Sequence, residues 1–343
     1  MFSVGLPLTL FLAGGLLCLA STTSLPERSI VKRAPSGPKL FGDDFPDPAV
    51  INYANTWYSF ATQKAYSAIR TQVASSSDFN TWQLVNNSVG SQHDAMPNLA
   101  SWVYSPNPNV WAPDVNLLSS GSFIMYYCAT TSQSTSHHCV GAAHSSNIVG
   151  PYTADSSPLI CNLTAGGDID PSGYSENGQQ YLLWKVDGNS LGNSGLCGND
   201  NGQYSTRIRI QTVGSGGVTL QGGITDLLDN CDYLKNCASG TTDNGIVEAP
   251  SLAKVGSTYV LFFSSGCYAT SNYRVNYATS SSLLGPYTRH SGSLFQNGTY
   301  GLNSPGGASI ARDGQHLVFH ANYGSGRALY TDVISVSGTT VSG

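Results

Sequence analysis

The stretch Ser145-Ser-Asn-Ile-Val-Gly-Pro-Tyr-Thr153 returns almost unchanged 135 residues later, as Ser280-Ser-Ser-Leu-Leu-Gly-Pro-Tyr-Thr288. A weaker copy, Ser76-Ser-Asp-Phe-Asn-Thr-Trp82, precedes the first by about 69 residues. These distances indicate a repeating unit of about 67 residues. Self-similarity at such a period is typical of proteins that repeat one supersecondary unit, and it limits the fold class before any other feature of the chain is considered.

Five strand-like runs accompany this repeat, each rich in aromatic and β-branched residues and bounded by Gly, Asn or Ser. They are 57–62, 122–128, 180–186, 258–264 and 316–321. No segment has a long helical period of apolar residues. We therefore predict an all-β protein, a five-bladed β-propeller with four short strands in each blade and the active site at one end of the central channel. The alternative, two similar hairpins in one β-sandwich, would need an unusually large sandwich.

Composition and the N-terminus point to secretion. Only 10% of the 343 residues are charged, and the net charge of −5 leaves no basic face for nucleic acid. An apolar run ending in small residues predicts a signal peptide at 1–20. We expect a propeptide at 21–33, ending in the dibasic pair Lys32-Arg33, and one domain at 34–343. A membrane anchor is the alternative, but the run is short and contains a Pro and three Gly.

Seven cysteines remain after the predicted signal peptide, an odd number that leaves at least one without an intrachain partner. An oxidising compartment favours disulfides. Cys231 and Cys237 could close a short loop, and Cys128 and Cys139 could bridge neighbouring strands. No pair has the spacing of a zinc site. Three sequons agree with secretion, at Asn86, Asn162 and Asn297.

Three acidic residues stand in apolar, proline-marked segments: Asp47 in Phe-Pro-Asp-Pro-Ala, Asp170 in Asp-Ile-Asp-Pro-Ser, and Glu248 in Val-Glu-Ala-Pro-Ser. A proline within two residues restricts the backbone and helps to aim each side chain. Each acid could instead serve a turn or a cap. That reading suits Glu248 least, because an acid in an apolar strand is costly without a partner or a function. Asp168 is the rival to Asp170.

The three motifs, in this order, resemble those of glycoside hydrolase family 43. Trp111-Ala-Pro-Asp-Val115 and the Gly-Pro-Tyr turns are similar to further segments of that family, so the resemblance runs from about Phe45 to the C-terminus. It implies a five-bladed propeller that hydrolyses pentose linkages with inversion. It also implies that Asp47 is the general base, Glu248 the general acid, and Asp170 the residue that orients this acid and modulates its pKa.

Hydrolysis with inversion requires two carboxyl groups with different roles. Inversion needs one carboxylate that activates water and one protonated carboxyl on the opposite face of the sugar, about 6.5–9.5 Å apart. Both groups are available in this chain. No cofactor is required for this reaction.

Three further residues have supporting roles under the same resemblance. Trp111 is expected to stack on a sugar, or else to belong to the core, and Arg327 to bind a sugar hydroxyl or a catalytic carboxylate. His320 corresponds to a late histidine near a cation in the central channel, or is a buried histidine satisfied by hydrogen bonds. The resemblance allows a structural calcium ion there. The family's Gly-His-Asn-Ser pattern is replaced by Ser-Pro-Gly-Gly-Ala-Ser at 304–309, which weakens that expectation.

These observations predict a secreted, extracellular, monomeric glycosidase that releases terminal β-D-xylosyl or α-L-arabinofuranosyl residues from pentose-containing oligosaccharides or polysaccharides. An insert at 187–204 and the Cys231–Cys237 loop could close a pocket, which favours exo action. An endo-1,5-α-L-arabinanase is the first alternative, and a non-catalytic carbohydrate-binding propeller is the second. Nucleic acid and membranes are not expected partners. The chain has neither a Gly-x-Ser-x-Gly elbow nor a Walker loop.

Overall fold

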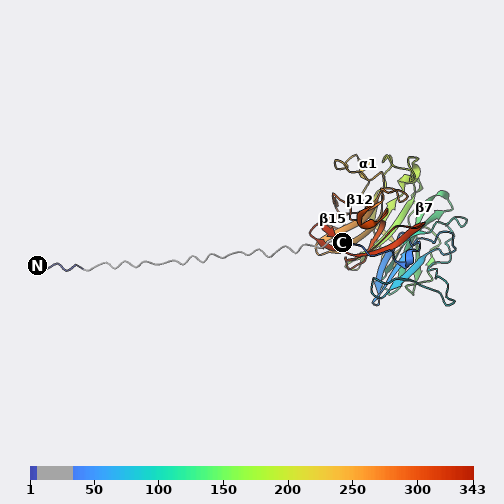
Figure 1. Ribbon diagram of the computed structural model, residues 1–343, viewed down its shortest axis with the longest axis horizontal. Coiled ribbons are helices and arrows are strands. Elements are labelled where there is room, and N and C mark those ends of the chain that lie inside the picture. Colours follow the sequence, from blue (N-terminus) through green and yellow to red (C-terminus); the bar gives the residue numbers. More distant parts are fainter. Residues whose placement is uncertain (6–33) are drawn as a thin grey trace. The chain divides into compact units, whose positions relative to one another are not determined.

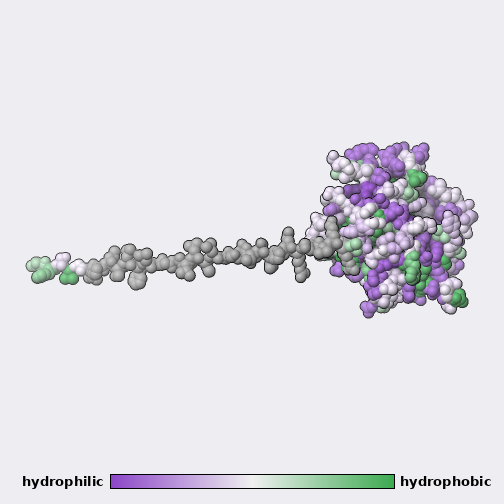
Figure 2. Space-filling model, viewed as in Figure 1, coloured by the Kyte–Doolittle hydropathy of each residue, from purple (hydrophilic) through white to green (hydrophobic). Residues whose placement is uncertain are grey.

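The computed structural model describes residues 1–5 and 34–343 (Figure 1). The predicted propeptide, its dibasic end and all but the first five residues of the predicted signal peptide therefore lie outside the described residues. Residues 34–343 belong to one compact unit. The face of this unit seen in Figure 2 is mostly hydrophilic, with apolar side chains scattered in small groups.

The described chain is all-β, as predicted. Its α-helical content is one short turn, α1 (Cys231–Leu234). Four 3-10 turns complete the helical elements of the described residues: η1 (Leu40–Gly42), η2 (Leu163–Ala165), η3 (Gly188–Leu191) and η4 (Thr299–Gly301). Among the described residues, none of these helices has the length and apolar character needed to cross a bilayer.

Four sheets have four strands each, joined in chain order and antiparallel. The first contains β1 (Ala49–Tyr53), β2 (Thr56–Ala61), β3 (Gln72–Ser76) and β4 (Gln83–Leu84). The second contains β5 (Trp111–Leu117), β6 (Phe123–Thr131), β7 (Ser134–Ser145) and β8 (Thr153–Ala154). The third contains β9 (Asp168–Glu176), β10 (Gln179–Val186), β11 (Ile208–Val213) and β12 (Leu220–Leu228). The fourth contains β13 (Val247–Val255), β14 (Thr258–Ser265), β15 (Arg274–Ser280) and β16 (Thr288–Arg289).

A fifth sheet joins the two ends of the unit. It contains β17 (Gly306–Ile310), β18 (His316–Tyr323) and β19 (Gly326–Val333), and a hairpin of β20 (Ser335–Ser337) and β21 (Thr340–Ser342) follows. The segment 36–45 lies along β19, where the Ser36 N–H donates to the Thr331 carbonyl at 2.8 Å and the Phe45 N–H donates to the Arg327 carbonyl at 2.8 Å. The first described strand-like segment thus pairs with the last sheet.

The five runs predicted as strands are the second strands of the five sheets, β2, β6, β10, β14 and β18. The apolar side chains of β6, β10, β14 and β18 are largely buried, and all nine residues of β6 are buried. In β2, Phe60 and Ala61 are buried and Trp57 is partly exposed. Aromatic and β-branched residues pack well on pleated surfaces that are covered on both faces, which explains why these runs are the strongest strand signals in the sequence.

The repeated stretch also has one structural position. Its copies at 145–153 and 280–288 connect β7 to β8 and β15 to β16, and the weaker copy at 76–82 connects β3 to β4. All three copies therefore join the third strand of a sheet to its fourth. The sequence repeat reports a repeat of four-stranded sheets.

The first strands of the five sheets contact one another in cyclic order, β1 to β5, β5 to β9, β9 to β13, β13 to β17 and β17 to β1. They surround a narrow cavity of about 40 Å³, to which each sheet contributes three consecutive residues with an equivalent residue in the middle. The middle residues are Pro48, Pro113, Pro171, Pro250 and Ala308. The proline-marked motifs of the sequence thus lie around one central space.

In the part of the chain that the structure describes, three disulfides connect six cysteines: Cys231 to Cys237 as predicted, Cys139 to Cys161, and Cys197 to Cys267. The predicted bridge between Cys128 and Cys139 is wrong, and Cys128 is a buried free thiol. The register of β6 and β7 places Cys128 opposite Val140 and Cys139 opposite Ala129. Since successive side chains of a strand point to opposite faces, the two sulfur atoms lie on different sides of the sheet.

Candidate active site

A pocket of about 470 Å³ lies where the first strands begin, and it brings together residues that are far apart in sequence. Five of the six predicted site residues line it: Asp47, Trp111, Asp170, Glu248 and Arg327. The sixth, His320, is fully buried beside Asp47. The walls also include residues of the predicted insert at 187–204 and of the loop that follows β14.

Each sheet has one residue with left-handed backbone at the edge of the central cavity, shortly before or near the start of its first strand. Asp47, Ala112, Asp170, Ala249 and Gly307 all have positive φ, between 44° and 58°, and the first four precede a proline. Left-handed backbone at residues other than glycine is unfavourable and is concentrated at functional sites. The first strands of the second to fifth sheets also carry a bulge at this point. Local irregularity of this kind re-aims side chains towards a pocket.

Asp47 is held as an ionised carboxylate. The Thr62 hydroxyl donates to Oδ2 at 2.7 Å, and Nη1 of Arg327 donates to Oδ1 at 3.0 Å. Burial alone would raise the pKa of Asp47, but the Arg327 charge and these hydrogen bonds outweigh it and lower the pKa below its ordinary value. Asp47 is therefore ionised at pH values where an ordinary carboxyl is still partly protonated.

Asp170 has the opposite environment. Burial, and next the charge of Glu248, raise the pKa of Asp170 above its ordinary value. The two carboxyl groups are joined through the backbone, because the N–H of Ala249, directly after Glu248, donates to Asp170 Oδ2 at 2.9 Å. Asp170 therefore retains its proton at pH values where an ordinary carboxyl has lost it.

Of the two neighbouring aspartates, only Asp170 lines the pocket. Asp168 is fully buried, and it accepts hydrogen bonds from the Asn162 N–H at 2.6 Å and from Nε1 of Trp184 at 3.0 Å. These bonds tie the start of β9 to β10 and to the preceding turn. Asp168 is thus committed to the structure of the third sheet.

The sequence analysis missed Lys185, which lines the floor of the pocket. Its side chain has no exposed surface, and Nζ lies 3.1 Å from Glu248 Oε2 and 3.1 Å from Asp187 Oδ1. The signal was present in the run 180–186, where a single charged residue stands in an apolar strand. A charge in an apolar strand is costly without a partner or a function, and this holds for Lys185 as it does for Glu248.

Two aromatic side chains border the acid groups. Trp111 stacks on His138 with ring centroids 4.0 Å apart and an angle of 25° between the planes. Burial lowers the pKa of His138 to about 4, so the ring is a neutral support for the indole. On the other side, the Arg327 guanidinium lies 5.1 Å from the ring centre of Tyr268, which is half exposed. Planar groups of this kind can pack against the apolar face of a sugar.

His320 does not fit as a direct ligand of a cation. The Asp47 N–H donates to its Nδ1 at 3.0 Å, and burial lowers the pKa of the imidazole to about 3. A neutral ring that accepts at Nδ1 carries its proton on Nε2, which then has no lone pair for a metal. Nε2 is buried and has no partner among the described residues, so it can donate to a water or to another acceptor. Calcium also prefers oxygen ligands.

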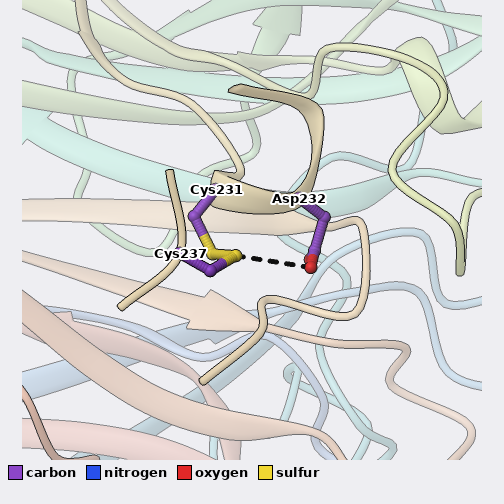
Figure 3. Close-up of side chains that lie close together, drawn as sticks. All are labelled: Cys231, Asp232 and Cys237. Atoms are coloured by element: carbon purple, nitrogen blue, oxygen red, sulfur yellow. Dashed lines mark hydrogen bonds between the residues drawn. A yellow bond between two sulfur atoms is a disulfide. The ribbon is translucent and has the colours of Figure 1, made fainter. Parts of the chain in front are cut away.

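The described residues include one other group of possible metal ligands, Cys231, Asp232 and Cys237, which Figure 3 shows. The two sulfur atoms form a disulfide and are unavailable as thiolates. Asp232 Oδ2 accepts the N–H groups of Asp243 at 2.9 Å and Gly245 at 2.8 Å. This cluster orders a loop.

Comparison with known proteins agrees with the chemistry of the pocket. The model of glycosyl hydrolases family 43 matches residues 41–334. An extracellular endo-α-(1→5)-L-arabinanase of Bacillus subtilis is 25% identical over 293 residues, which cover 80% of this chain and 79% of that protein. An extracellular endo-α-(1→5)-L-arabinanase of Thermotoga petrophila is 33% identical over 142 residues, which cover 39% of this chain and only 27% of that longer protein.

The fold is also similar to that of a solved structure from this family. A thermostable family-43 glycoside hydrolase of known crystal structure superposes with a TM-score of 0.69 at 21% identity, covering 90% of this chain and 95% of that one. At this identity the likeness speaks for the fold alone. The family model, in contrast, spans most of the chain and includes every residue of the pocket described above. This chain belongs to glycosyl hydrolases family 43.

Proposed function

We propose that this protein is a secreted, inverting glycosidase that removes terminal β-D-xylosyl or α-L-arabinofuranosyl residues from xylan, arabinoxylan or arabinan chains. Its scaffold would be a single domain at 34–343, in which the five sheets are the blades of a five-bladed β-propeller. The cyclic contacts of the first strands and the pairing of segment 36–45 with β19 support this arrangement.

In the proposed reaction Asp47 is the general base. Its lowered pKa keeps it ionised, and it takes a proton from the water that attacks the anomeric carbon. Glu248 is the general acid and protonates the leaving oxygen. Asp170 modulates this acid through its own charge and through its bond to the backbone of Ala249. The C–O bond breaks as water adds from the opposite face, so the anomeric configuration inverts.

Exo action is supported by one observation above all, the construction of the pocket wall. The Cys197–Cys267 disulfide joins the insert at 187–204 to the loop after β14. Next to it, Leu196 and Tyr268 line the pocket; Leu196 is largely exposed and Tyr268 is half exposed. A wall of two loops joined covalently beside the general acid limits how far a polysaccharide can extend past the scissile bond. The Cys231–Cys237 loop, also expected to close the pocket, is not among the residues that line it.

Endo-1,5-α-L-arabinanase activity is the second candidate, because both relatives described above carry that name. The same three carboxyl groups serve either mode. A non-catalytic binding propeller is not favoured, since a buried set of acids with opposite pKa shifts is expensive to maintain for binding alone.

Substrate recognition would use the two side chains expected from the sequence. Trp111 offers its indole to the sugar ring from the second sheet, supported by His138. Arg327 can donate to a sugar hydroxyl while it pairs with Asp47. The proposed chemistry needs no cofactor, because two carboxyl groups supply both proton transfers. A calcium ion in the central cavity would have to be held by oxygen ligands, with His320 donating to one of its waters. We expect a monomer.

Product analysis tests the proposal. The protein is incubated with linear xylo-oligosaccharides, 1,5-arabino-oligosaccharides and arabinoxylan, and the newly released anomer is followed by NMR. Single pentose units of inverted configuration are expected. Mixed oligosaccharides from arabinan would support the endo alternative, retention would overturn the roles of Asp47 and Glu248, and no release from any substrate would favour the binding propeller.

A further inference from the structure

Lys185 is the one lysine or arginine among the described residues that is buried. It lies on β10, directly across from Ile169 on β9, and its side chain is completely buried. Removing an ammonium group from water costs several kcal/mol unless partners compensate. A structural contact between strands would not need a charge, since apolar residues of similar volume often stabilise a core as well or better. The buried charge of Lys185 therefore indicates a function in the pocket.

Its partners indicate that role. Nζ lies 3.1 Å from Glu248 Oε2 and 3.1 Å from Asp187 Oδ1. Among the hydrogen bonds of the described residues, Glu248 uses only Oε2, so Oε1 stays available to a glycosidic oxygen in the pocket. Lys185 thus fixes one oxygen of the acid and leaves the other to react. Asp187, 9% exposed, fixes the ammonium group in turn.

Near the proposed acid, two carboxyl groups, those of Glu248 and Asp187, are in hydrogen-bond contact with one cation, Lys185. Asp170 and Glu248 form the carboxyl pair, and Arg327 is bound to Asp47. Within the described part of the chain, Lys185 is the cation in hydrogen-bond contact with the pair. The other titratable and charged groups that face the pair or its lysine are Asp47, Cys128, His138, Asp187, Tyr273 and Arg327.

We propose that Lys185, held by Asp187, is a positioning residue for the general acid: it aims the Glu248 carboxyl and sets the pH at which the Asp170–Glu248 pair loses its proton. This inference rests on the proposed function. The ammonium charge favours the ionised pair, while burial and mutual repulsion favour the protonated pair. Asp187 partly neutralises the ammonium group and so weakens its effect. Lys185 and Asp187 therefore act on the pair in opposite directions.

The test is the pH dependence of kcat/KM for wild type, Lys185→Met and Asp187→Asn on one natural oligosaccharide. The basic limb reports loss of the proton that the general acid must donate. In Lys185→Met the pair keeps its proton to higher pH, and the limb moves up by about 1–2 units. In Asp187→Asn the lysine is less neutralised, and the limb moves down by about 0.5–1 unit. Lys185→Arg keeps the charge and is expected to keep the limb within about 0.5 unit of wild type.

Lys254→Met is the matched control. Lys254 forms a similar ion pair with Glu176, at 2.6 Å, outside the pocket, and its loss leaves both limbs in place. A purely structural Lys185 would lower the rate at every pH without moving the limb, or would move it in the same direction in both variants. Either result overturns the inference. If Lys185→Met does not fold, Asp187→Asn decides alone, and an unchanged or raised limb refutes it.

Failure of the proposed function gives a different result. Glu248→Gln is assayed in parallel on the same oligosaccharide. If that variant keeps wild-type activity, Glu248 is not the acid, and the proposed function falls together with the role of Lys185. If Glu248→Gln is inactive and the basic limb does not respond to Lys185 or Asp187, only the inference about Lys185 is wrong.

Discussion

Replacing Arg327 by glutamine removes the charge that keeps the proposed base ionised. The guanidinium lies 3.0 Å from Asp47 Oδ1, and the two side chains are 23% and 21% exposed. An opposite charge at this distance lowers the pKa of a carboxyl by about 1–3 units, and partial exposure to solvent places this pair in the lower half of that range. Burial, which raises the pKa of Asp47, then acts with less opposition.

The sign of the effect follows from the role of Asp47. The base works when ionised, so activity is lost as the pH falls through its pKa. Because that pKa is below its ordinary value of 3.8 in the wild type, the acidic limb lies at the edge of the accessible range. In Arg327→Gln the limb moves up by about 1–2 units, and each unit corresponds to about 1.4 kcal/mol. On the acidic side of this limb, kcat/KM falls about tenfold per unit.

The assay is kcat/KM from pH 3.5 to 8 on one natural oligosaccharide, with Arg209→Gln as control. Arg209 forms a comparable ion pair with Asp226, at 2.8 Å, away from the pocket. A contact of Arg327 with the sugar would raise KM at every pH, whereas its effect on Asp47 moves the limb. An acidic limb that stays in place in Arg327→Gln would refute the reasoning that this arginine controls the base.

Three more predictions concern the acid, the neighbouring aspartates and the pocket wall. Glu248→Gln should lose about 10²–10⁴-fold in kcat on natural glycosides and less on aryl glycosides with good leaving groups. Asp168→Asn should lower the free energy of unfolding by about 1–3 kcal/mol and keep kcat, whereas Asp170→Asn should lower kcat without loss of stability at neutral pH. Replacing Cys197 and Cys267 by serine should raise the proportion of oligosaccharides among the products from arabinan.

For each of these predictions, one result would contradict the assigned role. Equal loss on both leaving groups would remove the acid role from Glu248. Chemical or thermal denaturation is paired with kinetics for the two aspartates, and the same response in both would contradict their separate roles. For the pocket wall, the Cys231–Cys237 pair is the control, because its loop does not line the pocket. Product patterns measured by chromatography should change in the first cysteine variant only.

Part of the fold was predictable because it depends on local patterns. The five apolar runs fill the second strands, whose burial on both faces requires the aromatic and branched residues that make strands recognisable. The repeated stretch indicated four-stranded units because it always joins the third strand to the fourth. Ala112-Pro113 repeats the pattern of Asp47-Pro48 and Asp170-Pro171, and in all three the residue before proline has a left-handed backbone.

Other features required the tertiary structure. The disulfide partner of Cys197 lies 70 residues along the chain, and no local pattern identifies it. The bridge expected between Cys128 and Cys139 failed because strand register decides which face each sulfur occupies. His320 was expected either near a cation or as a buried histidine satisfied by hydrogen bonds, and the hydrogen bond from the Asp47 N–H, 273 residues away in sequence, determines its tautomer.

The all-β class, the repeat, the family and the three carboxyl groups could be recognised before the structure was known, because apolar patterning and proline-marked motifs are local features of the chain. The tertiary structure decided what each carboxyl can do. Asp47 and Asp170 have similar local sequences, yet their pKa values shift in opposite directions. Arg327 is 280 residues from Asp47, and Lys185 is 63 residues from Glu248. Charge interactions depend on distance in space, and only folding establishes that distance.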